Sequence, residues 1–299
     1  MRWAALFLYW QAVRDHSDMR SKSYVKWVGD KTKLIGAIGA RLPIAYGDYI
    51  EPFVGGGSLF FETLPGCALL ADANERLVRT HVAVRDKPEK VIALLSTYRN
   101  EPDFFELMRK RSQSIDAESD AEVAAWMIFL SKTAHGGLYR VNSSNGYNVP
   151  FGKRKAPRIC DTDRIRTCSA ALQAASIECA SFETTMLRAR EGDFVYCDPP
   201  YAKVATTSFV GYTADGFAGY QHIKLRDIAI DLGRRGVHVL ISNSDAPAVR
   251  DLYRGNGFHL QEVLVRRHLP VNGRHRGVVN ELLISNYPPD HAVLARTGT

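Results

Sequence analysis

The sequence predicts an α/β protein, a sheet domain interrupted near its middle by a mainly helical insertion that carries a β-hairpin. Three observations support this fold class. A β-prone run that ends in a glycine cluster precedes a helix start at Ser58. Apolar runs that end in polar residues recur towards both ends of the chain. Between them lies a long stretch of helical periodicity, followed by a segment rich in Gly, Asn and Ser.

The N-terminal part predicts a helix, two strands and the turn between them. Apolar residues recur at helical spacing over about residues 32–41, and Pro43 stops the pattern. The run GDYIEPFVGGG predicts a short strand with a glycine turn, and SLFFETL predicts the helix after it. The next apolar run, CALLADAN, ends in Asp72 and Asn74, as a second parallel strand should.

In the middle of the chain the sequence pattern changes once, from helical periodicity to short β-like runs. Residues 86–133 follow a helical pattern, with an apolar stripe behind a cap at Ser119 or Asp120. Residues 135–157 contain the turn signal Asn145-Gly146 between short β-like runs. This segment predicts a hairpin that presents side chains and does not pack a core.

The C-terminal part returns to strands. GDFVYCDPPY and GVHVLISNSD each predict one, and the helix between them is expected to end at the glycines at 233 and 236. FHLQEVLVRRHL and VVNELLISNY predict two further strands joined by a basic loop.

Composition excludes several classes of protein. With 45% hydrophobic residues among 299, the chain is not intrinsically disordered. Five Cys without a C-x-x-C pair argue against a disulfide framework and against a zinc site, so no metal is expected. No apolar run approaches the ~18 residues of a membrane span, and no cleavage site follows the short apolar start. We expect a cytoplasmic protein, with residues 1–20 an extension and Met19 an alternative start.

The formal net charge of +7 is unevenly distributed. Residues 140–166 hold seven basic and two acidic residues, and residues 264–276 hold four Arg and no acid. Two basic patches on a near-neutral body favour a polyanionic partner, although two solvated loops would look the same. Lys153 and Arg274, one in each patch, are candidate phosphate contacts.

The sequence DPPY offers a set of hydrogen-bond acceptors beside an aromatic ring. Asp198 directly follows an apolar strand, where open α/β sheets bind ligands. Pro199 and Pro200 remove two backbone donors, and Tyr201 supplies a stacking face. Such a set would bind a planar group with an exocyclic amine, such as adenine. A strand-ending turn capped by Asp198 is the simpler alternative.

The sequence EPFVGGG would allow the backbone to approach a ligand closely. It departs from G-x-G-x-x-G because Phe60 stands where the third glycine would be, which disfavours a nicotinamide-dependent oxidoreductase. Asp72, at the next strand end, is placed to accept hydrogen bonds from ribose hydroxyls.

Together, six blocks resemble the Dam-type DNA adenine N6-methyltransferase family, in the family's order, over about residues 26–287. They are KWVGDK, EPFVGGG, LLADAN, HGGLYRVN with NGYNVPFGK, DPPY, and RRHLPVNGRHRGVVNELLI. The resemblance implies S-adenosylmethionine as donor and a Rossmann-like methyltransferase sheet with an inserted target-recognition domain. It implies catalysis by Asp198, Pro199, Pro200 and Tyr201. Donor contacts would come from Trp27, Lys31, Phe53, Gly55, Gly57, Asp72, Ser181, Phe182 and Asp198.

The resemblance also implies how DNA is recognised. Leu138 would wedge into the base stack and Arg140 would read a guanine. Asn142 and Pro150 would complete the reading surface, and the target would be a GATC-like site in double-stranded DNA. The catalytic domain would span residues 21–85 and 177–290, and the recognition domain residues 86–176. A bacterial or phage-encoded monomer, or a dimer on DNA, is expected, with or without a restriction partner.

Two departures from the family pattern and two rival functions remain. Asp30 stands where the family has glycine, and His135 and Gly136 stand where relatives carry Tyr and Asn. A methyltransferase of the same fold could act on RNA or on a glutamine amide. A catalytically silent DNA-binding module would be expected to have a damaged DPPY or glycine loop, and both are intact here.

Overall fold

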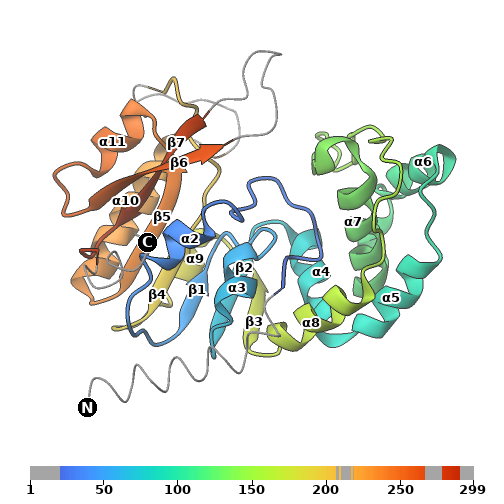
Figure 1. Ribbon diagram of the computed structural model, residues 1–299, viewed down its shortest axis with the longest axis horizontal. Coiled ribbons are helices and arrows are strands. Elements are labelled where there is room, and N and C mark those ends of the chain that lie inside the picture. The colour runs from blue at the N-terminus through green and yellow to red at the C-terminus, as the bar shows by residue number, and fades with distance from the viewer. Residues whose placement is uncertain (1–20, 207–208, 210–216, 218, 267–277, 290–299) are drawn as a thin grey trace, which may run out of the picture. The chain divides into compact units, whose positions relative to one another are not determined.

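The computed structural model describes residues 21–206, 209, 217, 219–266 and 278–289, and these form an α/β fold (Figure 1). The sheet has seven strands in the order β3-β2-β1-β4-β5-β7-β6. Strand β1 runs parallel to β2 and β4, and β4 parallel to β5, whereas β7 is antiparallel to β5 and β6. The predicted α/β class is confirmed, and the sheet is mixed. The strands are β1 (Tyr49–Glu51), β2 (Ala68–Asp72), β3 (Ala175–Cys179), β4 (Phe194–Cys197), β5 (His238–Ser244), β6 (His259–Arg266) and β7 (Val278–Ser285).

Helices connect the strands and fill the middle of the chain. The α-helices are α2 (Ile35–Gly39), α3 (Ser58–Thr63), α4 (Glu75–Asp86), α5 (Pro88–Ser96), α6 (Pro102–Arg111), α7 (Asp120–Thr133), α8 (Thr162–Leu172), α9 (Phe182–Met186), α10 (Gly219–Arg234) and α11 (Pro247–Tyr253). Two short 3-10 helices are η2 (Ile115–Ala117) and η3 (His135–Gly137). None of the helices in the described ranges is both long and apolar enough to cross a bilayer.

The described residues fall into two compact units. Unit 1 comprises residues 21–30, 55–66 and 74–179. Unit 2 comprises residues 31–54 and 67–73 and the described residues between 180 and 289.

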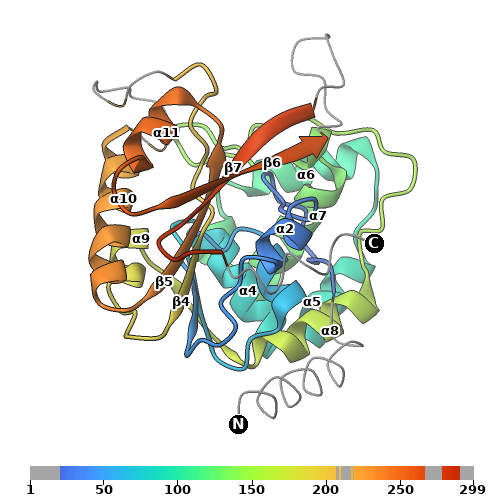
Figure 2. The same cartoon turned by 60° about the vertical axis from the view of Figure 1, so that its left-hand side comes forward.

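The core of unit 2 contains strands β1 and β4, which are buried along their whole length. All four residues of β4 are buried, and the side chains of α9 and α10 pack with those of β4 and β5 in one apolar cluster. Figure 2 shows α10 and α11 along one face of these strands. Because β4 ends at Cys197, the first residue after it, Asp198, emerges at the carboxyl edge of the sheet, as predicted.

Unit 1 is built around α7. The predicted cap is confirmed, because Ser119 and Glu122 form a capping box at its start. The single apolar stripe is a poorer prediction, since α7 is buried on nearly every side. Trp126 lies in this core and its indole N–H donates to the carbonyl of Met108 at 2.7 Å.

The predicted hairpin is only partly confirmed. In place of a ladder, residues 134–151 form a loop closed by two isolated antiparallel bridges, Ala134 with Phe151 and Val141 with Tyr147. The expectation that the segment packs no core is wrong for Tyr147 and Val149, which are buried. A few backbone hydrogen bonds cross the loop, such as those from Asn142 to Gly146 and from Asn148 to Arg140, and side-chain hydrogen bonds, described below, add to them.

Two predicted helix boundaries also need correction. The first helix is shorter than residues 32–41, because residues 32–34 form a turn before α2. Helix α10 does not stop at Gly233 but continues to Arg234. A Cβ at Gly233 would lie 2.9 Å from the side-chain nitrogen of Asn286, so this glycine permits close packing. Gly236, with a φ of +77°, follows the helix end.

Candidate active site and recognition segment

The carboxylate of Asp198 is held by two donors within unit 2. The ammonium of Lys31 lies 2.7 Å from Oδ1, and the hydroxyl of Ser242 donates to the same oxygen at 2.8 Å. The side chain of Asp198 is 19% exposed, so it still faces an opening. Ser242 belongs to β5, next to β4 in the sheet, and the two strands together fix the carboxylate.

The ring of Tyr201 is fixed beside Asp198. Its hydroxyl donates to Glu281 Oε2 at 2.9 Å, and Lys31 Nζ lies 4.5 Å from the ring centroid. The amide N–H of the next residue, Ala202, donates to Asn243 Oδ1 at 3.2 Å. Of the two prolines between, Pro199 is buried and Pro200 is exposed. The predicted combination of carboxylate and aromatic ring is therefore present within one unit.

Burial and like charges perturb the acids of this crevice. Burial raises the pKa of Asp198, while Lys31 and the Ser242 hydroxyl lower it. Burial raises the pKa of Glu51 to about 8, and the nearby carboxylates of Asp198 and Asp72 add to this rise. The Tyr49 hydroxyl donates to Glu51 at 2.8 Å. That hydrogen bond, like the charge of Lys31, lowers the pKa of Glu51 and opposes part of the rise that burial causes.

The predicted donor contacts of unit 2 also lie near strand ends. Phe53 stacks on Phe182 with ring centroids 5.3 Å apart, so two of the predicted donor contacts form one aromatic wall. The carbonyl of Asp72 accepts a hydrogen bond from the Ala180 amide at 3.3 Å, which places the end of β2 beside the start of α9. The Ser181 hydroxyl accepts from the Thr184 amide and caps α9.

The glycine loop and Trp27 come together in unit 1. Gly55 has a φ of +49°, and a Cβ there would lie 2.9 Å from the Trp27 ring. Gly57, with a φ of +69°, caps α3 in the left-handed region. The Gly55 carbonyl is 2.8 Å from His81 Nε2, and Trp27 stacks on Tyr139 at 5.4 Å. Glycine is therefore required at 55 by both the backbone and the neighbouring indole.

The predicted DNA-reading residues lie on the loop of unit 1. Leu138 is 39% exposed and Arg140 is exposed, with its Nε donating to Asn148 Oδ1 at 2.7 Å. Asn142 also has a structural task, because its Oδ1 accepts from the amides of Ser144 and Gly146. Pro150, also on the loop, is exposed. Of the two predicted phosphate contacts, Lys153 follows the loop and is exposed, and Arg274 is outside the described residues.

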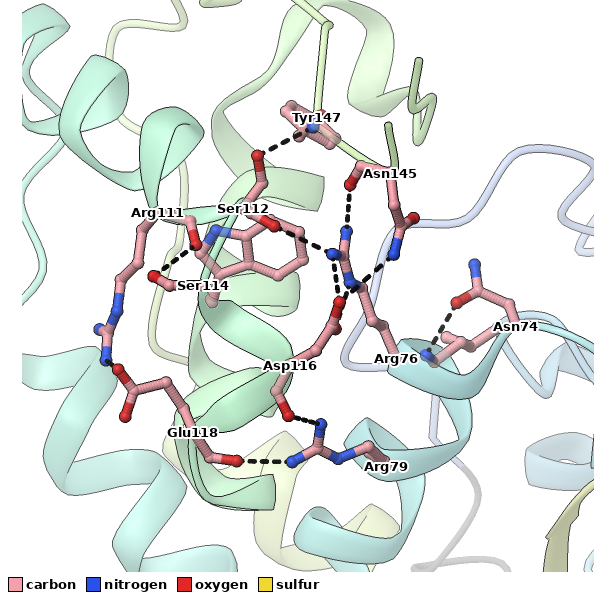
Figure 3. Close-up of polar contacts among 12 residues, drawn as sticks. Asn74, Arg76, Arg79, Arg111, Ser112, Ser114, Asp116, Glu118, Asn145 and Tyr147 are labelled. Atoms are coloured by element: carbon pink, nitrogen blue, oxygen red, sulfur yellow. Dashed lines mark hydrogen bonds and ion pairs between the residues drawn. The ribbon is translucent and has the colours of Figure 1, made fainter. Parts of the chain in front are cut away.

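Arg76, a buried arginine on α4, holds this loop by hydrogen bonds (Figure 3). Arg76 is 4% exposed and forms a two-pronged ion pair with Asp116, at 2.6 and 2.7 Å. It also donates to the carbonyls of Asn145 and Ser112, at 3.0 and 2.9 Å. The Ser112 hydroxyl in turn accepts from the Tyr147 amide at 2.9 Å. The loop is therefore tied by side chains to α4, to the end of α6 and to η2.

Sequence reasoning missed several residues that build these sites. Ser242 and Glu281 hold Asp198 and Tyr201, and both are polar residues inside otherwise apolar strands. A polar residue inside an apolar strand is a signal in the sequence from which both roles could have been suspected. Arg76 gave no comparable signal, because an arginine on a helix is most often at the surface.

The structure also bears on Cys197 as a nucleophile and on a metal site. Cys197, next to Asp198, is completely buried, and burial raises the pKa of its thiol well above the usual value. Among the described residues no group of three or more His, Cys, Asp or Glu is arranged to hold a metal ion.

Comparison with known proteins supports the same chemistry. Residues 27–269 match the model of the D12 class N6 adenine-specific DNA methyltransferases. The chain is 36% identical to the type II methyltransferase M1.LlaDCHI of Lactococcus lactis subsp. cremoris over 273 residues, which cover 89% of this chain and 95% of that one. It is 33% identical to the type II methyltransferase M.MjaIII of Methanocaldococcus jannaschii over 291 residues, 90% of this chain and 100% of that one. It is 33% identical to the DNA adenine methylase of Escherichia coli (strain K12) over 268 residues, which cover 88% of this chain and 95% of that one.

Proposed function

This chain belongs to the family of D12 class N6 adenine-specific DNA methyltransferases, and from that premise we propose the details of its reaction. Family membership makes it an adenine-specific DNA methyltransferase that depends on S-adenosylmethionine. We propose that it acts on an adenine rotated out of duplex DNA into the crevice beside Asp198. Such rotation costs a few kcal/mol and is usual for enzymes that modify a base.

One observation carries this proposal, which is that the crevice already holds an amine. Lys31 Nζ lies 2.7 Å from Asp198 Oδ1 and 4.5 Å from the centre of the Tyr201 ring. An adenine amino group could likewise donate to the Asp198 carboxylate, while the adenine ring stacks on the Tyr201 ring in place of the cation–π contact. The site is thus suited to an N–H donor attached to a planar group.

In the proposed reaction the adenine amine donates two hydrogen bonds, one to the Asp198 carboxylate and one to the carbonyl of Pro199. This would localise the nitrogen lone pair and direct it at the sulfonium methyl group. A carbon–nitrogen bond forms as the carbon–sulfur bond breaks, and the amine nitrogen loses one proton to solvent. Most of the acceleration would come from holding two reactants in line, worth roughly 7–11 kcal/mol in favourable cases.

The donor would be held by residues near the strand ends and by the glycine loop. The aromatic wall of Phe53 and Phe182 suits an adenine ring, and Asp72 at the end of β2 suits ribose hydroxyls. Lys31 and Trp27 are proposed to bind the methionine end, with Gly55 and Gly57 leaving room for it. The remaining proposed donor contacts are Ser181 and Asp198.

Recognition of DNA is assigned to residues 86–176, which unit 1 contains entirely. We propose that Leu138 enters the base stack, that Arg140 reads a guanine, and that the site resembles GATC. Asn142 and Pro150 would border the reading surface, and Lys153 would contact phosphate. Residues 21–85 and 177–290 are the proposed catalytic domain, with a methyltransferase sheet of the Rossmann-like type.

Mapping of methylated adenines tests this proposal. The wild-type chain, labelled S-adenosylmethionine and random-sequence duplex DNA should yield N6-methyladenine at one short sequence. Asp198→Ala should abolish methylation while retaining most of the affinity for the donor. Retention of near-normal turnover by that variant would refute the role of Asp198. Label found in RNA or protein but absent from DNA would favour the rival substrates.

A further inference from the structure

A cavity of about 300 Å³ opens in unit 2 at the opposite edge of the sheet from Asp198. It lies where β5 begins and where the chain continues after β7, and His238, at the start of β5, lines it. His238 pairs with Phe194, the first residue of β4, whereas Asp198 follows the last. At ~3.3 Å per residue, the two edges are about 13 Å apart along β4. The cavity is therefore separate from the proposed active site.

Arg41 gives this cavity an unpaired positive charge. Arg41 is 4% exposed, and its Nε is buried with no hydrogen-bond partner. Within the described residues, no ion pair neutralises its guanidinium. Burial lowers its pKa, and the Tyr287 side chain has the opposite effect. A buried charge without a partner is costly, so native structures normally supply one.

The other polar groups of the cavity are arranged around Arg41. His238 Nδ1 is likewise buried and without a partner among the described residues. The Tyr287 hydroxyl donates to the Arg41 carbonyl at 2.7 Å, and its ring meets His238 edge-on at 5.2 Å. The rest of the lining is apolar and includes Leu42 and Pro43.

We propose that this cavity binds a small organic oxyanion, a carboxylate or phosphate monoester, with its charged oxygens on Arg41. A guanidinium matches the planar oxygens of such groups in a two-pronged contact. The volume lies at the lower end of small-molecule sites, about 300–1,000 Å³, and exceeds the needs of an inorganic ion. The apolar walls would hold the body of the ligand, as most small-molecule pockets do.

Thermal unfolding with three matched probes tests this site. Phenyl phosphate has both charge and an apolar body, inorganic phosphate has charge alone, and benzyl alcohol has the body alone. Phenyl phosphate should raise the wild-type melting temperature by roughly 5 °C at a hundredfold excess over its dissociation constant. Inorganic phosphate should raise it less, and benzyl alcohol should have no saturable effect.

Arg41→Met supplies the decisive variant, and Arg234→Met, on the exposed end of α10, is its control. Arg41→Met should lose the response to phenyl phosphate, whereas Arg234→Met should keep it. Without ligand, Arg41→Met should melt no lower than the wild type, because an unpaired buried charge has been removed. Equal responses in the wild type and in folded Arg41→Met would overturn the proposal.

Asp290→Asn then distinguishes a free oxyanion from a carboxylate of the chain itself, because Asp290 follows Pro289, which lines the cavity. A carboxylate that competes for Arg41 would make phenyl phosphate bind more tightly to this variant. Unchanged binding would assign the site to a free ligand.

Direct confirmation would come from the Arg41 Nε–H resonance in an NMR spectrum, which should shift on titration with phenyl phosphate. Absence of any shift at saturating ligand would refute the contact.

Discussion

The Asp198 crevice and the loop that is proposed to read DNA are supported in different ways. In the crevice, neighbouring strands hold the reactive side chains, and Ser242 and Glu281 on β5 and β7 bond directly to Asp198 and Tyr201. In the loop, Arg140 is exposed, and the support comes from side chains such as Arg76 beneath it. Fixed geometry suits the bond-making step, and an exposed loop suits contact with a long polymer.

The difference also concerns charge. The crevice concentrates acids whose pKa burial raises, and Lys31 is the cation that lowers the pKa of Asp198 against that effect. The loop presents Arg140 to solvent, where its charge costs little. Mutations in the crevice should therefore change the chemical step, and mutations in the loop should change DNA affinity and sequence preference.

Lys31→Met should have the largest effect. Lys31 lowers the pKa of Asp198, so its removal raises that pKa further and leaves less of the ionised carboxylate at any given pH. In the pH–rate profile of methylation, the acid limb should move to higher pH. The rate at neutral pH should fall on the order of 100-fold. Single-turnover rates at saturating donor and DNA measure this.

Ser242→Ala is the control, because it removes a weaker influence on the same carboxylate. Its acid limb should move in the same direction by a smaller amount. An unmoved acid limb in Lys31→Met would show that Asp198 does not need to be ionised for the reaction.

Arg76→Met should weaken the attachment of the loop and leave the contacts of Asp198 unchanged. It removes the ion pair to Asp116 and the bond to the Asn145 carbonyl, which should cost about 2 kcal/mol of stability. We expect the KM for DNA to rise on the order of tenfold, a change of ~1.4 kcal/mol, with kcat at saturating DNA unchanged.

Arg79→Met is its matched control. Arg79 lies on the same helix and bonds to Asp120 and to the carbonyls of Asp116 and Glu118, but none of these belongs to the loop (Figure 3). It should lose comparable stability with little change in KM for DNA. If both variants raise KM equally, general loosening of unit 1 is responsible and the anchor has no specific role.

The sequence predicted the strand ends well, and the reason is physical. A buried parallel strand must be apolar, so a polar residue at its end marks the carboxyl edge of the sheet, as Asp72, the last residue of β2, and Asp198, the first after β4, do. The glycine loop was predicted as a place where the backbone approaches a ligand closely, and the structure shows that the Trp27 ring comes close to Gly55, which the sequence did not indicate.

The supports of the loop could not be predicted in this way. Arg76 and Asp116 are 40 residues apart, and nothing in either local pattern indicates that they pair. The hairpin prediction rested on β-like runs around Asn145-Gly146, but Asn142 and Ser112 satisfy backbone groups that a ladder would have used. Pairings of this kind depend on how α4, η2 and the loop pack, which periodicity does not encode.

Arg140→Ala should change sequence preference by a moderate amount. A bidentate contact from arginine to guanine contributes about 1–3 kcal/mol of discrimination. The ratio of methylation rates on cognate and guanine-substituted duplexes should fall accordingly. Asn148→Ala, which frees Arg140 Nε from its partner, should alter the ratio less. A uniform loss of activity on all sequences would assign Arg140 to the phosphate backbone.

The smallest effect is expected at Lys153, which would contact phosphate only. Lys153→Gln should weaken binding to every DNA sequence alike and should reduce the slope of log affinity against log salt by about one. Lys90→Gln, an exposed lysine of α5, is the matched control and should leave the slope unchanged. Fluorescence anisotropy over a salt series measures both. Because each neutralised phosphate releases counterions whatever the bases are, a slope that changes for one sequence only would place Lys153 among the base-reading residues.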